Sequence, residues 1–326
     1  MTQHLPLRNR ICRLGLLPLA MLIACGALHA QTIRVTLLGT GTPNPHPERF
    51  GPATLVEAGD QKLLFDVGRG ATIRLNQLGI PMRDVSAVFV THFHSDHMVG
   101  LADLWLIGWL PPNYGRRQVP LRIVGPSGLK KITDGMEQTY ATDIGIRVKD
   151  EGLSRSAATF DVSEYSDDGK VYEKDGVVVR AFAVNHGDLI KPAYGYRIDY
   201  AGRSVAISGD TRFDENLIEA AKGVDLLVHE VCTIPDELFK VNPAMKRVAA
   251  HHTSAEEVGT VFSRVQPKLG LLTHYVLVGG PGIPPVTKEE VVARVRSNYS
   301  GPLVAGRDLM SVEVGDSVAV VPNQAE

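Results

Sequence analysis

The feature that most constrains this chain is the stretch Thr91–His97, whose sequence is Thr-His-Phe-His-Ser-Asp-His. It follows the short apolar run Ala87–Val90, which predicts a buried strand. From Met98 to Trp109 apolar side chains recur at spacings of three and four, which is the pattern of a helix. Three histidines and one carboxylate therefore lie where a strand is followed by a helix.

These four side chains have the chemistry of metal ligands. Residues two apart in an extended chain point the same way, so His92 and His94 can share one ion. Asp96 and His97 follow where the chain turns, and they can reach a second ion. Imidazoles packed together without a metal would repel one another when protonated and would bury polar nitrogens. The stretch therefore predicts a metal site rather than an ordinary polar turn.

Four predicted strands in the second half of the chain also lead into a histidine or a carboxylate. The runs and the residues after them are Val177–Val184 with His186, Val205–Ile207 with Asp210, Leu226–Val228 with Glu230, and Leu269–Thr273 with His274. A carboxylate at the end of a buried strand, such as Asp210, would be costly without a cation. These strand ends therefore carry further candidates for functional residues.

The stretch matches His-x-His-x-Asp-His, and from about Ile33 onward the chain resembles the metallo-β-lactamase superfamily. Within it, the chain is similar to the branch that contains ribonuclease Z and to periplasmic arylsulfatases. The resemblance implies an α/β fold in a single domain, a four-layer αβ/βα sandwich with two metal ions at one edge. No linker or internal repeat divides residues 31–326.

The resemblance also implies a role for each polar residue. The first ion would be held by three histidines, the second by an aspartate and two histidines, and both by one shared aspartate. In that order the implied ligands are His92, His94 and His186, then Asp96, His97 and His274, and finally Asp210. Catalysis would use Asp96 to orient the attacking hydroxide, His252 to protonate the leaving group and Glu230 to orient His252. Asp66 would accept a proton from the far nitrogen of a ligand histidine.

Nitrogen and oxygen ligands without a thiolate suit two Zn²⁺ ions, with Mn²⁺ or iron as alternatives. We expect a hydrolase that cleaves phosphodiester or aryl sulfate esters of small molecules through a metal-activated hydroxide. A lactonase or β-lactamase is the alternative, because the same fold supports it and its leaving group needs less protonation. A binding module without catalysis would predict gaps in the ligand set, and all seven ligands are present.

The first thirty residues have the pattern of a secretory signal peptide. Arg8, Arg10 and Arg13 precede the apolar run Leu14–Ala24, which is too short to cross a bilayer, and a small residue stands at Ala30. Cleavage there predicts a periplasmic or secreted enzyme that starts at Gln31. The segment 22–25 also resembles a lipoprotein box, in which Cys25 would carry lipid and tether the enzyme to a membrane. Cys232 would then be the only cysteine outside the signal, and we expect it to be buried.

The charge balance bears on the partner. The chain has 34 basic and 36 acidic residues, and loss of the three arginines in the signal leaves 31 against 36, a net charge of −5. Gripping a polyanion normally needs clustered lysine and arginine. Long-armed ribonuclease Z enzymes insert a tRNA-gripping arm between the third histidine and the shared aspartate, where this chain has only 23 residues. We therefore expect nucleic acid to be an unlikely partner and tRNA processing the least favoured activity; relatives of this branch also suggest a homodimer.

Several segments near the site carry weaker expectations. Trp105 and Trp109, four apart, predict core packing, with an aromatic rim for a flat substrate as the alternative. Residues 141–170 are polar and weakly periodic, which indicates a surface insert or a lid. His46 is expected in an exposed loop after the first strand, and the glycine- and proline-rich loop 279–285 is expected to form a pocket wall.

Overall fold

The computed structural model describes residues 1–2, 31–111 and 115–322. Most of the predicted signal segment, including Cys25, lies outside the described residues. From Gln31 onward the chain forms one compact unit. No helix in the described ranges combines the length and apolar character that a membrane span needs. Cys232 is buried, as expected, and burial raises the pKa of its thiol.

Two β-sheets form the centre of this unit, and the described residues contribute eight strands to the first and seven to the second. In spatial order the first sheet contains β15 (Val318–Val321), β14 (Ser311–Val314), β1 (Ile33–Gly39), β2 (Ala53–Ala58), β3 (Gln61–Phe65), β4 (Ala87–Phe89), β5 (Leu121–Pro126) and β6 (Phe160–Tyr165). The second contains β13 (Leu303–Ala305), β12 (Leu269–Leu277), β11 (Leu226–Thr233), β10 (Arg203–Ile207), β9 (Tyr194–Tyr200), β8 (Val177–Ala183) and β7 (Gly169–Lys174).

The core between the sheets follows from the period-two alternation of the strands, which turns one set of apolar side chains inward. Aromatic rings from both sheets meet there. Phe65 and Phe89 of the first sheet stack with ring centroids 4.8 Å apart, and Tyr196 of the second sheet packs edge-on at 5.2 Å from Phe65. Edge-on and stacked pairs of this kind stabilise a packed interior beyond their area burial. The sheets are therefore held face to face by a continuous apolar layer.

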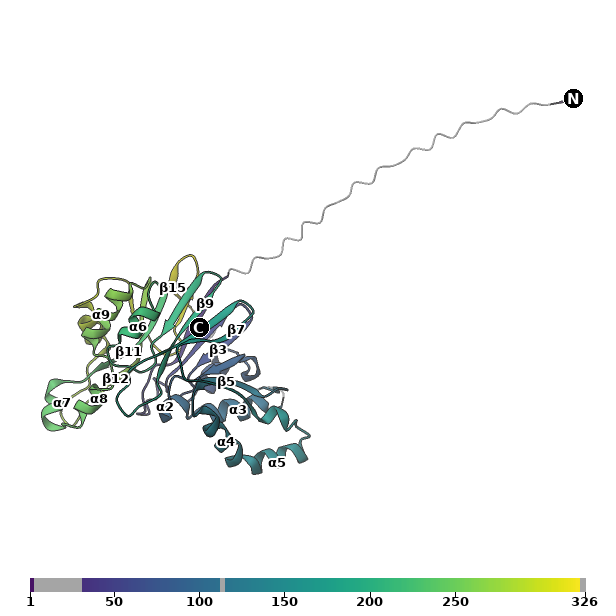
Figure 1. Ribbon diagram of the computed structural model, residues 1–326, viewed down its shortest axis with the longest axis horizontal. Coiled ribbons are helices and arrows are strands. Elements are labelled where there is room, and N and C mark those ends of the chain that lie inside the picture. The colour runs from purple at the N-terminus through teal and green to yellow at the C-terminus, as the bar shows by residue number, and fades with distance from the viewer. Residues whose placement is uncertain (3–30, 112–114, 323–326) are drawn as a thin grey trace. The chain divides into compact units, whose positions relative to one another are not determined.

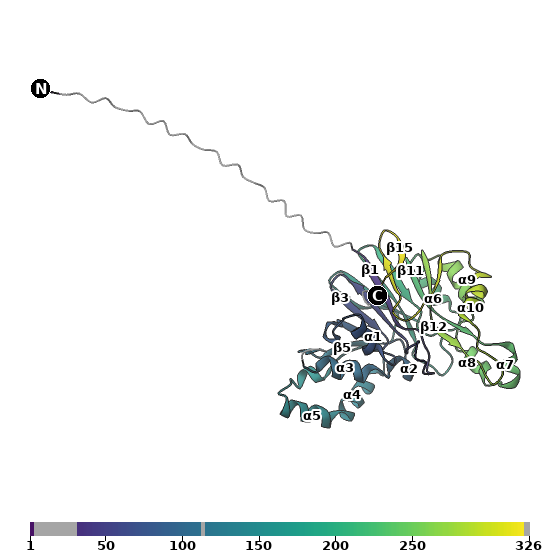
Figure 2. The same ribbon diagram turned by 180° about the vertical axis from the view of Figure 1, so that it is seen from behind.

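Helices cover both outer faces, which gives the four-layer αβ/βα sandwich expected from the sequence (Figures 1 and 2). The helices on the first sheet are α1 (Ala71–Gln77), α2 (Ser95–Met98), α3 (Leu101–Trp109), α4 (Leu129–Thr139) and α5 (Ala141–Asp150), with the short 3₁₀ turns η1 (Met82–Asp84) and η2 (Ser156–Ala158). Those on the second are α6 (Glu215–Ala220), α9 (Ala255–Val265) and α10 (Lys288–Arg296), with α7 (Asp236–Val241) and α8 (Met245–Ala249) between β11 and α9.

The parallel strands decide where a site can form. Strands β3, β4 and β5 are parallel in the first sheet, and β10, β11 and β12 are parallel in the second. Loops that follow the carboxyl ends of parallel strands gather at one edge of a sheet, where ligands bind in open α/β sheets. Asp66 follows β3 and the metal stretch follows β4, so both lie at this edge of the first sheet. Asp210 follows β10 and lies at the corresponding edge of the second sheet.

Residues 141–170 differ from the sequence-based expectation of an insert or lid. Helix α5 occupies 141–150, and β6 pairs in parallel with β5 as an edge strand of the first sheet. Phe160 and Val162 pack into the core under the helices, whereas Tyr165 packs into the core between the sheets. The alternation of Phe160-Asp161-Val162-Ser163 is a strand signal that the polar surroundings obscured. The segment is therefore part of the framework.

The two tryptophans are core residues, and the alternative of an aromatic rim is wrong. Trp105 and Trp109 are 0% and 2% exposed. The indole nitrogen of Trp109 donates to the carbonyl of Ser154, and the Trp105 ring lies 4.5 Å from that of Phe160. They pin α3 to the segment after α5 and therefore cannot contact a substrate.

Candidate metal centre

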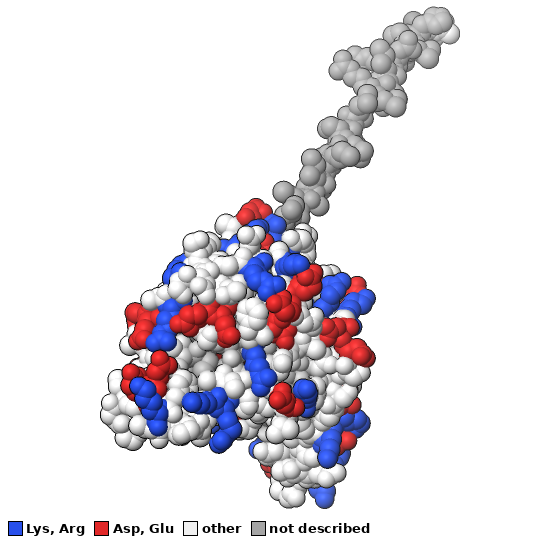
Figure 3. All heavy atoms as spheres, turned by 60° about the vertical axis from the view of Figure 1, so that its left-hand side comes forward, with Lys and Arg blue, Asp and Glu red and all other residues white. Residues whose placement is uncertain are grey.

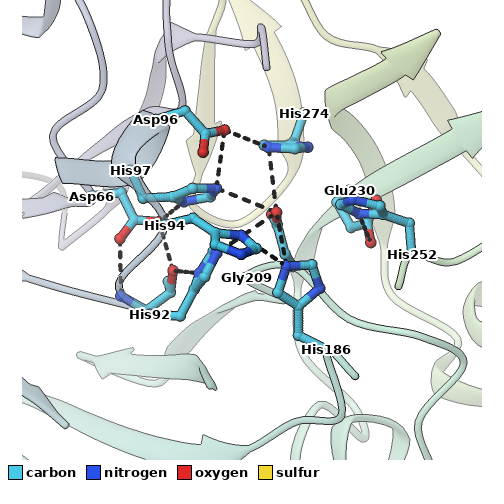
Figure 4. Close-up of polar contacts among 12 residues, drawn as sticks. Asp66, His92, His94, Asp96, His97, His186, Gly209, Glu230, His252 and His274 are labelled. Carbon is cyan, nitrogen blue, oxygen red and sulfur yellow. Dashed lines mark hydrogen bonds and ion pairs between the residues drawn. The ribbon is translucent and has the colours of Figure 1, made fainter. Parts of the chain in front are cut away.

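The metal stretch begins where β4 ends and α2 begins. His92 and His94 precede α2, while Asp96 and His97 lie in its first turn. All of them except His94 are buried. The backbone of the stretch is tied to the loop after β3, because the Val67 amide donates to the His97 carbonyl at 2.8 Å. The loop that carries the four side chains is therefore held in place. The side chains point from it toward the same region of the molecule (Figure 4).

The second sheet brings the remaining ligands from strand ends. His186 follows β8, and its Nδ1 lies 2.8 Å from the carbonyl of His251, so Nε2 is left to face the site. Asp210 follows Gly209, whose backbone is left-handed with φ of 60°. A side chain at Gly209 would also meet the carbonyl of Tyr194 at 2.6 Å. Only glycine satisfies both conditions, so this position fixes how Asp210 enters the centre.

His274 is placed by an irregularity in β12. The pairing of β11 with β12 shifts register between Glu230 and Val231, so that His274 is the extra residue of a bulge. Its φ of 41° is left-handed, which is uncommon for a residue with a side chain. Strained backbone of this kind persists where the surroundings hold it, often at functional sites. The bulge aims the imidazole toward Asp96 and Asp210.

The side chains form two clusters joined by Asp210. His92, His94, His186 and Asp210 make the first, and Asp96, His97 and His274 make the second, with the ligand atoms of each cluster within 4.8 Å of one another. Asp210 Oδ2 lies 3.9 Å and 3.7 Å from Nε2 of His92 and His186, and 3.3 Å and 3.4 Å from Nε2 of His97 and His274. One carboxylate oxygen thus faces both clusters.

The donor set fits two cations. Nε2 of His92, Nε2 of His97 and both ring nitrogens of His274 are buried, and they have no hydrogen-bond partner. Buried polar atoms are normally paired, so a group of orphaned nitrogens that converge on carboxylates is explained by metal ligation. Imidazole and carboxylate without thiolate suit zinc, and the clusters hold ligands enough for two ions.

Electrostatics in the centre favour the metal-binding forms of His92, His186 and Asp210. Burial lowers the pKa of His186 to about 4, so this imidazole is neutral at physiological pH. Burial also lowers the pKa of His92. Burial opposes the charge on Asp210, but the surrounding imidazoles, led by His274 and His97, hold its pKa well below the usual range. Neutral histidines and an ionised carboxylate are the ligand states that a divalent cation requires. His97 differs, because burial opposes its charge but Asp210 and Asp66 raise its pKa well above the ordinary value. Cation binding would therefore have to displace a proton from His97.

A second polar unit stands beside the clusters. His252 Nδ1 lies 3.0 Å from Glu230 Oε1, and the same oxygen accepts the amides of Thr211 and Thr253 at 3.2 Å each. One ring nitrogen of His252 lies within 4.8 Å of Asp210 and His274. Because Nδ1 is taken by Glu230, Nε2 is the atom that faces the centre. Burial disfavours the charged imidazole, but Glu230 outweighs it and raises the pKa of His252 to about 9.

Asp66 supports the centre from behind. Its Oδ2 lies 2.7 Å from His97 Nδ1, and its two oxygens also accept the hydroxyl and amide of Thr91. Its backbone is left-handed, with φ of 58°, and its amide donates to the carbonyl of Phe89. Sequence reasoning placed Asp66 behind a ligand histidine without naming which one, and it passed over Thr91, whose hydroxyl next to the first ligand was the available signal.

Three further histidines and the loop 279–285 lie outside the two clusters. His229 is buried with Nδ1 against the carbonyl of Glu230, away from the clusters, and His251 contributes its carbonyl rather than its ring. His46 is exposed, as expected, and lines a cavity of about 750 Å³. Pro285, at the end of the expected pocket-wall loop, lines the same cavity, as does Leu277, three residues after His274.

The fold and the centre define a metal-dependent hydrolase of the metallo-β-lactamase superfamily. The structure resembles YhfI of Bacillus subtilis with a TM-score of 0.66 and 17% identity, covering 86% of this chain and 99% of that one. It resembles human tRNase Z, short form, with a TM-score of 0.61 and 21% identity, covering 85% and 98%.

The sequence comparisons narrow this class. Residues 33–276 match the family model described as "Anti-Pycsar protein Apyc1", and the chain belongs to that family. Over 284 residues it is 34% identical to ribonuclease Z of Mycobacterium marinum, covering 86% of this chain and 99% of that protein. Relatives named for RNA cleavage count against our expectation that nucleic acid is an unlikely partner.

Proposed function

We propose that this protein is a dinuclear zinc phosphodiesterase that prefers small phosphodiesters to folded tRNA. The observation that carries the proposal is the His252–Glu230 pair beside Asp210 and His274. A phosphodiester with an alkoxide leaving group needs a proton donor, whereas a lactone or β-lactam depends on one less. The similarity to ribonuclease Z over nearly the whole chain supports phosphorus rather than sulfur as the reacting atom.

The residues divide the work as follows. His92, His94, His186 and Asp210 would hold one Zn²⁺, and Asp96, His97, His274 and Asp210 the other. Two such ions would lower the pKa of a nearby water toward ~7 and would neutralise charge on the reacting oxygens. Asp96, whose Oδ2 lies 3.5 Å from His274 Nε2, supplies an acceptor at the edge of the centre that can orient the attacking oxygen.

His252 acts on the leaving group. At neutral pH it carries a proton on Nε2, because Glu230 stabilises the charged ring through Nδ1. Transfer of that proton to the departing oxygen leaves His252 neutral, still held by Glu230. General acids of this kind contribute ~10²–10⁴-fold to a rate. The two threonine amides hold Glu230 Oε1 in place, so the ring does not turn away from the centre.

A cavity at the end of β12, the strand that carries His274, supports an anionic substrate. Four cationic side chains line the cavity of about 750 Å³, namely Arg49, Arg74, Lys288 and Arg307, together with Glu48 and Asp308. Asp308 is already engaged by Arg74 at 2.9 Å and by the amides of Thr40 and Phe50. Burial lowers the pKa of Lys288, and Arg49 lowers it further, whereas Asp308 and Glu289 oppose the shift. A phosphate of the substrate would pair with cations of this cavity.

Folded tRNA is the weaker candidate. A short loop (187–193), β9, β10 and their turn make up the connection between His186 and Asp210, so it carries no separate module for gripping RNA. On the face in Figure 3, lysine and arginine side chains alternate with aspartate and glutamate rather than forming one basic patch. Binding a long polyanion through its phosphates depends on such patches.

A substrate panel tests the proposal. Zinc-loaded protein would be assayed with bis(p-nitrophenyl) phosphate, a short single-stranded RNA, a precursor tRNA, p-nitrophenyl sulfate, a lactone and a cephalosporin. We expect turnover of the first two well above the rest. Faster hydrolysis of the sulfate, lactone or cephalosporin would overturn the phosphodiester assignment, and faster cleavage of precursor tRNA would overturn the preference for small substrates.

We further propose that the enzyme acts in the periplasm or outside the cell as a soluble protein that begins at Gln31. The support is the basic and apolar pattern of residues 1–30. Mass spectrometry of the mature protein from a secreting host should give a chain without those residues. A chain that begins at an acylated Cys25, or one that retains Met1, would contradict this start.

A further inference from the structure

A buried hydroxyl links the two clusters behind the ligands. Thr91 is 1% exposed and stands between β4 and the first ligand. Its Oγ1 donates to Asp66 Oδ2 at 2.8 Å and lies 2.9 Å from His92 Nδ1. The Thr91 amide donates to Asp66 Oδ1 at 2.9 Å, so the residue is held at two points.

The single proton of the Thr91 hydroxyl determines which tautomer the His92 ring adopts. Thr91 gives that proton to Asp66, so Oγ1 can only accept from His92. Nδ1 of His92 must then carry the ring proton, and Nε2 keeps its lone pair. Nε2 is the buried atom without a hydrogen-bond partner that faces Asp210.

The same carboxylate oxygen sets a ligand of the second cluster. Asp66 Oδ2 also accepts from His97 Nδ1 at 2.7 Å, which leaves Nε2 of His97 with a lone pair toward Asp96 and Asp210. One oxygen thus acts directly on the second cluster, and through Thr91 on the first. Figure 4 shows Asp66 behind both histidines.

We propose that Thr91 is a positioning residue that fixes the metal-binding tautomer of His92, and that Asp66 couples this tautomer to that of His97. The inference rests on the two-metal centre of the proposed function, but not on its substrate. It predicts an asymmetry: Thr91 should matter to the first ion only, whereas Asp66 should matter to both.

A matched pair of variants separates this role from simple packing. Thr91→Val keeps the branched shape but places a methyl group against His92 Nδ1 and Asp66 Oδ2. Thr91→Ser keeps the hydroxyl and loses the methyl. If Thr91 only fills space, serine should be the more harmful change; if its hydroxyl positions His92, valine should be. Asp66→Asn removes the charge that both histidines rely on.

The first readout is metal affinity, measured by titrating metal-free protein with Zn²⁺ against a chromophoric chelator. A His274→Ala background, which lacks a ligand of the second cluster, identifies the binding step of the first. We expect Thr91→Val to weaken the first step ~10–100-fold, the usual cost of losing a partner behind a ligand, and to leave the second unchanged. Thr91→Ser should bind nearly as the parent does, and Asp66→Asn should weaken both steps.

The second readout is the tautomer itself, followed by nitrogen-15 NMR of the histidine rings in metal-free protein, because a neutral ring that binds Zn²⁺ through Nε2 carries its proton on Nδ1 whatever its neighbours are. His92 should be protonated at Nδ1 in the parent and in Thr91→Ser, and it should lose that signature in Thr91→Val. Should Thr91→Val fail to fold, Thr91→Ser and Asp66→Asn still test the positioning of the two histidines through the same two readouts. Parental zinc affinities in Thr91→Val or Asp66→Asn, or equal weakening of both steps by Thr91→Val, would overturn the inference. A parent that binds two ions but cleaves no phosphodiester would refute the proposed function alone.

Discussion

His252 and Glu230 are joined through Nδ1 and Oε1 at 3.0 Å, with the other nitrogen of the imidazole turned toward Asp210 and His274. Glu230 comes from within β11, and His252 comes from the segment before α9. Two amides from different loops donate to the same carboxylate oxygen, Oε1. This pair combines a held orientation with a held proton, which are the two properties of a general acid.

Replacing His252 with alanine should therefore slow substrates according to their leaving group. We expect a ~10²–10⁴-fold loss of kcat for an alkyl phosphodiester and a much smaller loss for bis(p-nitrophenyl) phosphate, whose leaving group departs unprotonated. Metal analysis of the same variant should still give two ions. Equal losses on both substrates would reject the role of His252 in proton donation, and loss of an ion would make it a ligand instead.

The pH dependence should report the same proton. The active form of His252 is protonated, and that form declines as the pH rises through about 9. The kcat for an alkyl phosphodiester should therefore fall above pH 9. Glu230→Gln removes the charge that raises this pKa, so the alkaline limb should move to lower pH. A limb that stays in place in Glu230→Gln, or appears equally with the nitrophenyl substrate, would argue against the assignment.

The cation-lined cavity should govern affinity rather than chemistry. Arg49→Ala removes a cation that lines the cavity without removing a ligand. We expect KM to rise ~10–100-fold for a phosphodiester that carries a further phosphate, with kcat little changed, because charge-assisted hydrogen bonds to a phosphate are worth ~1.5–3 kcal/mol. Lys62→Ala, on the far side of the fold, is the matched control. An equal KM change with and without the additional phosphate would show that the cavity does not bind it.

Removing metal should reduce stability as well as activity. The orphaned nitrogens of His92, His97 and His274 gain their partners only when cations are bound. A ligand at 1,000 times its Kd stabilises the folded state by ~4.1 kcal/mol. Thermal unfolding with and without a chelator should show this as a clear drop in Tm, restored by added Zn²⁺. An unchanged Tm would mean that the folded protein gains nothing from metal at this centre.

Much of the centre could be predicted because its ligands follow apolar strands. Asp210 and His186 each come after a clear apolar run, and the spacing of the metal stretch limits the geometry of its four ligands. The structure also has the two strands and turn expected between His186 and Asp210. These features are local, so short segments of sequence contain them.

What could not be predicted depends on contacts between distant segments. The bulge that turns His274 inward arises from the register of β11 against β12, which no local pattern encodes. The three donors on Glu230 come from residues 19 to 23 positions away along the chain. The edge strand within 141–170 was missed because Phe160 and Val162 are isolated in a polar stretch. Tertiary pairing, not propensity, makes that segment a strand.

Each cluster draws ligands from both sheets: His92 and His97 stand on the first, and His186 and His274 on the second. A fragment that contains only one sheet would therefore have no complete coordination sphere, however well it folded. Tight cation uptake must await the docking of the two halves during biogenesis. A cleaved or misassembled chain would consequently be inactive rather than weakly active. Bound metal ions would then distinguish a correctly assembled chain from an incorrectly assembled one.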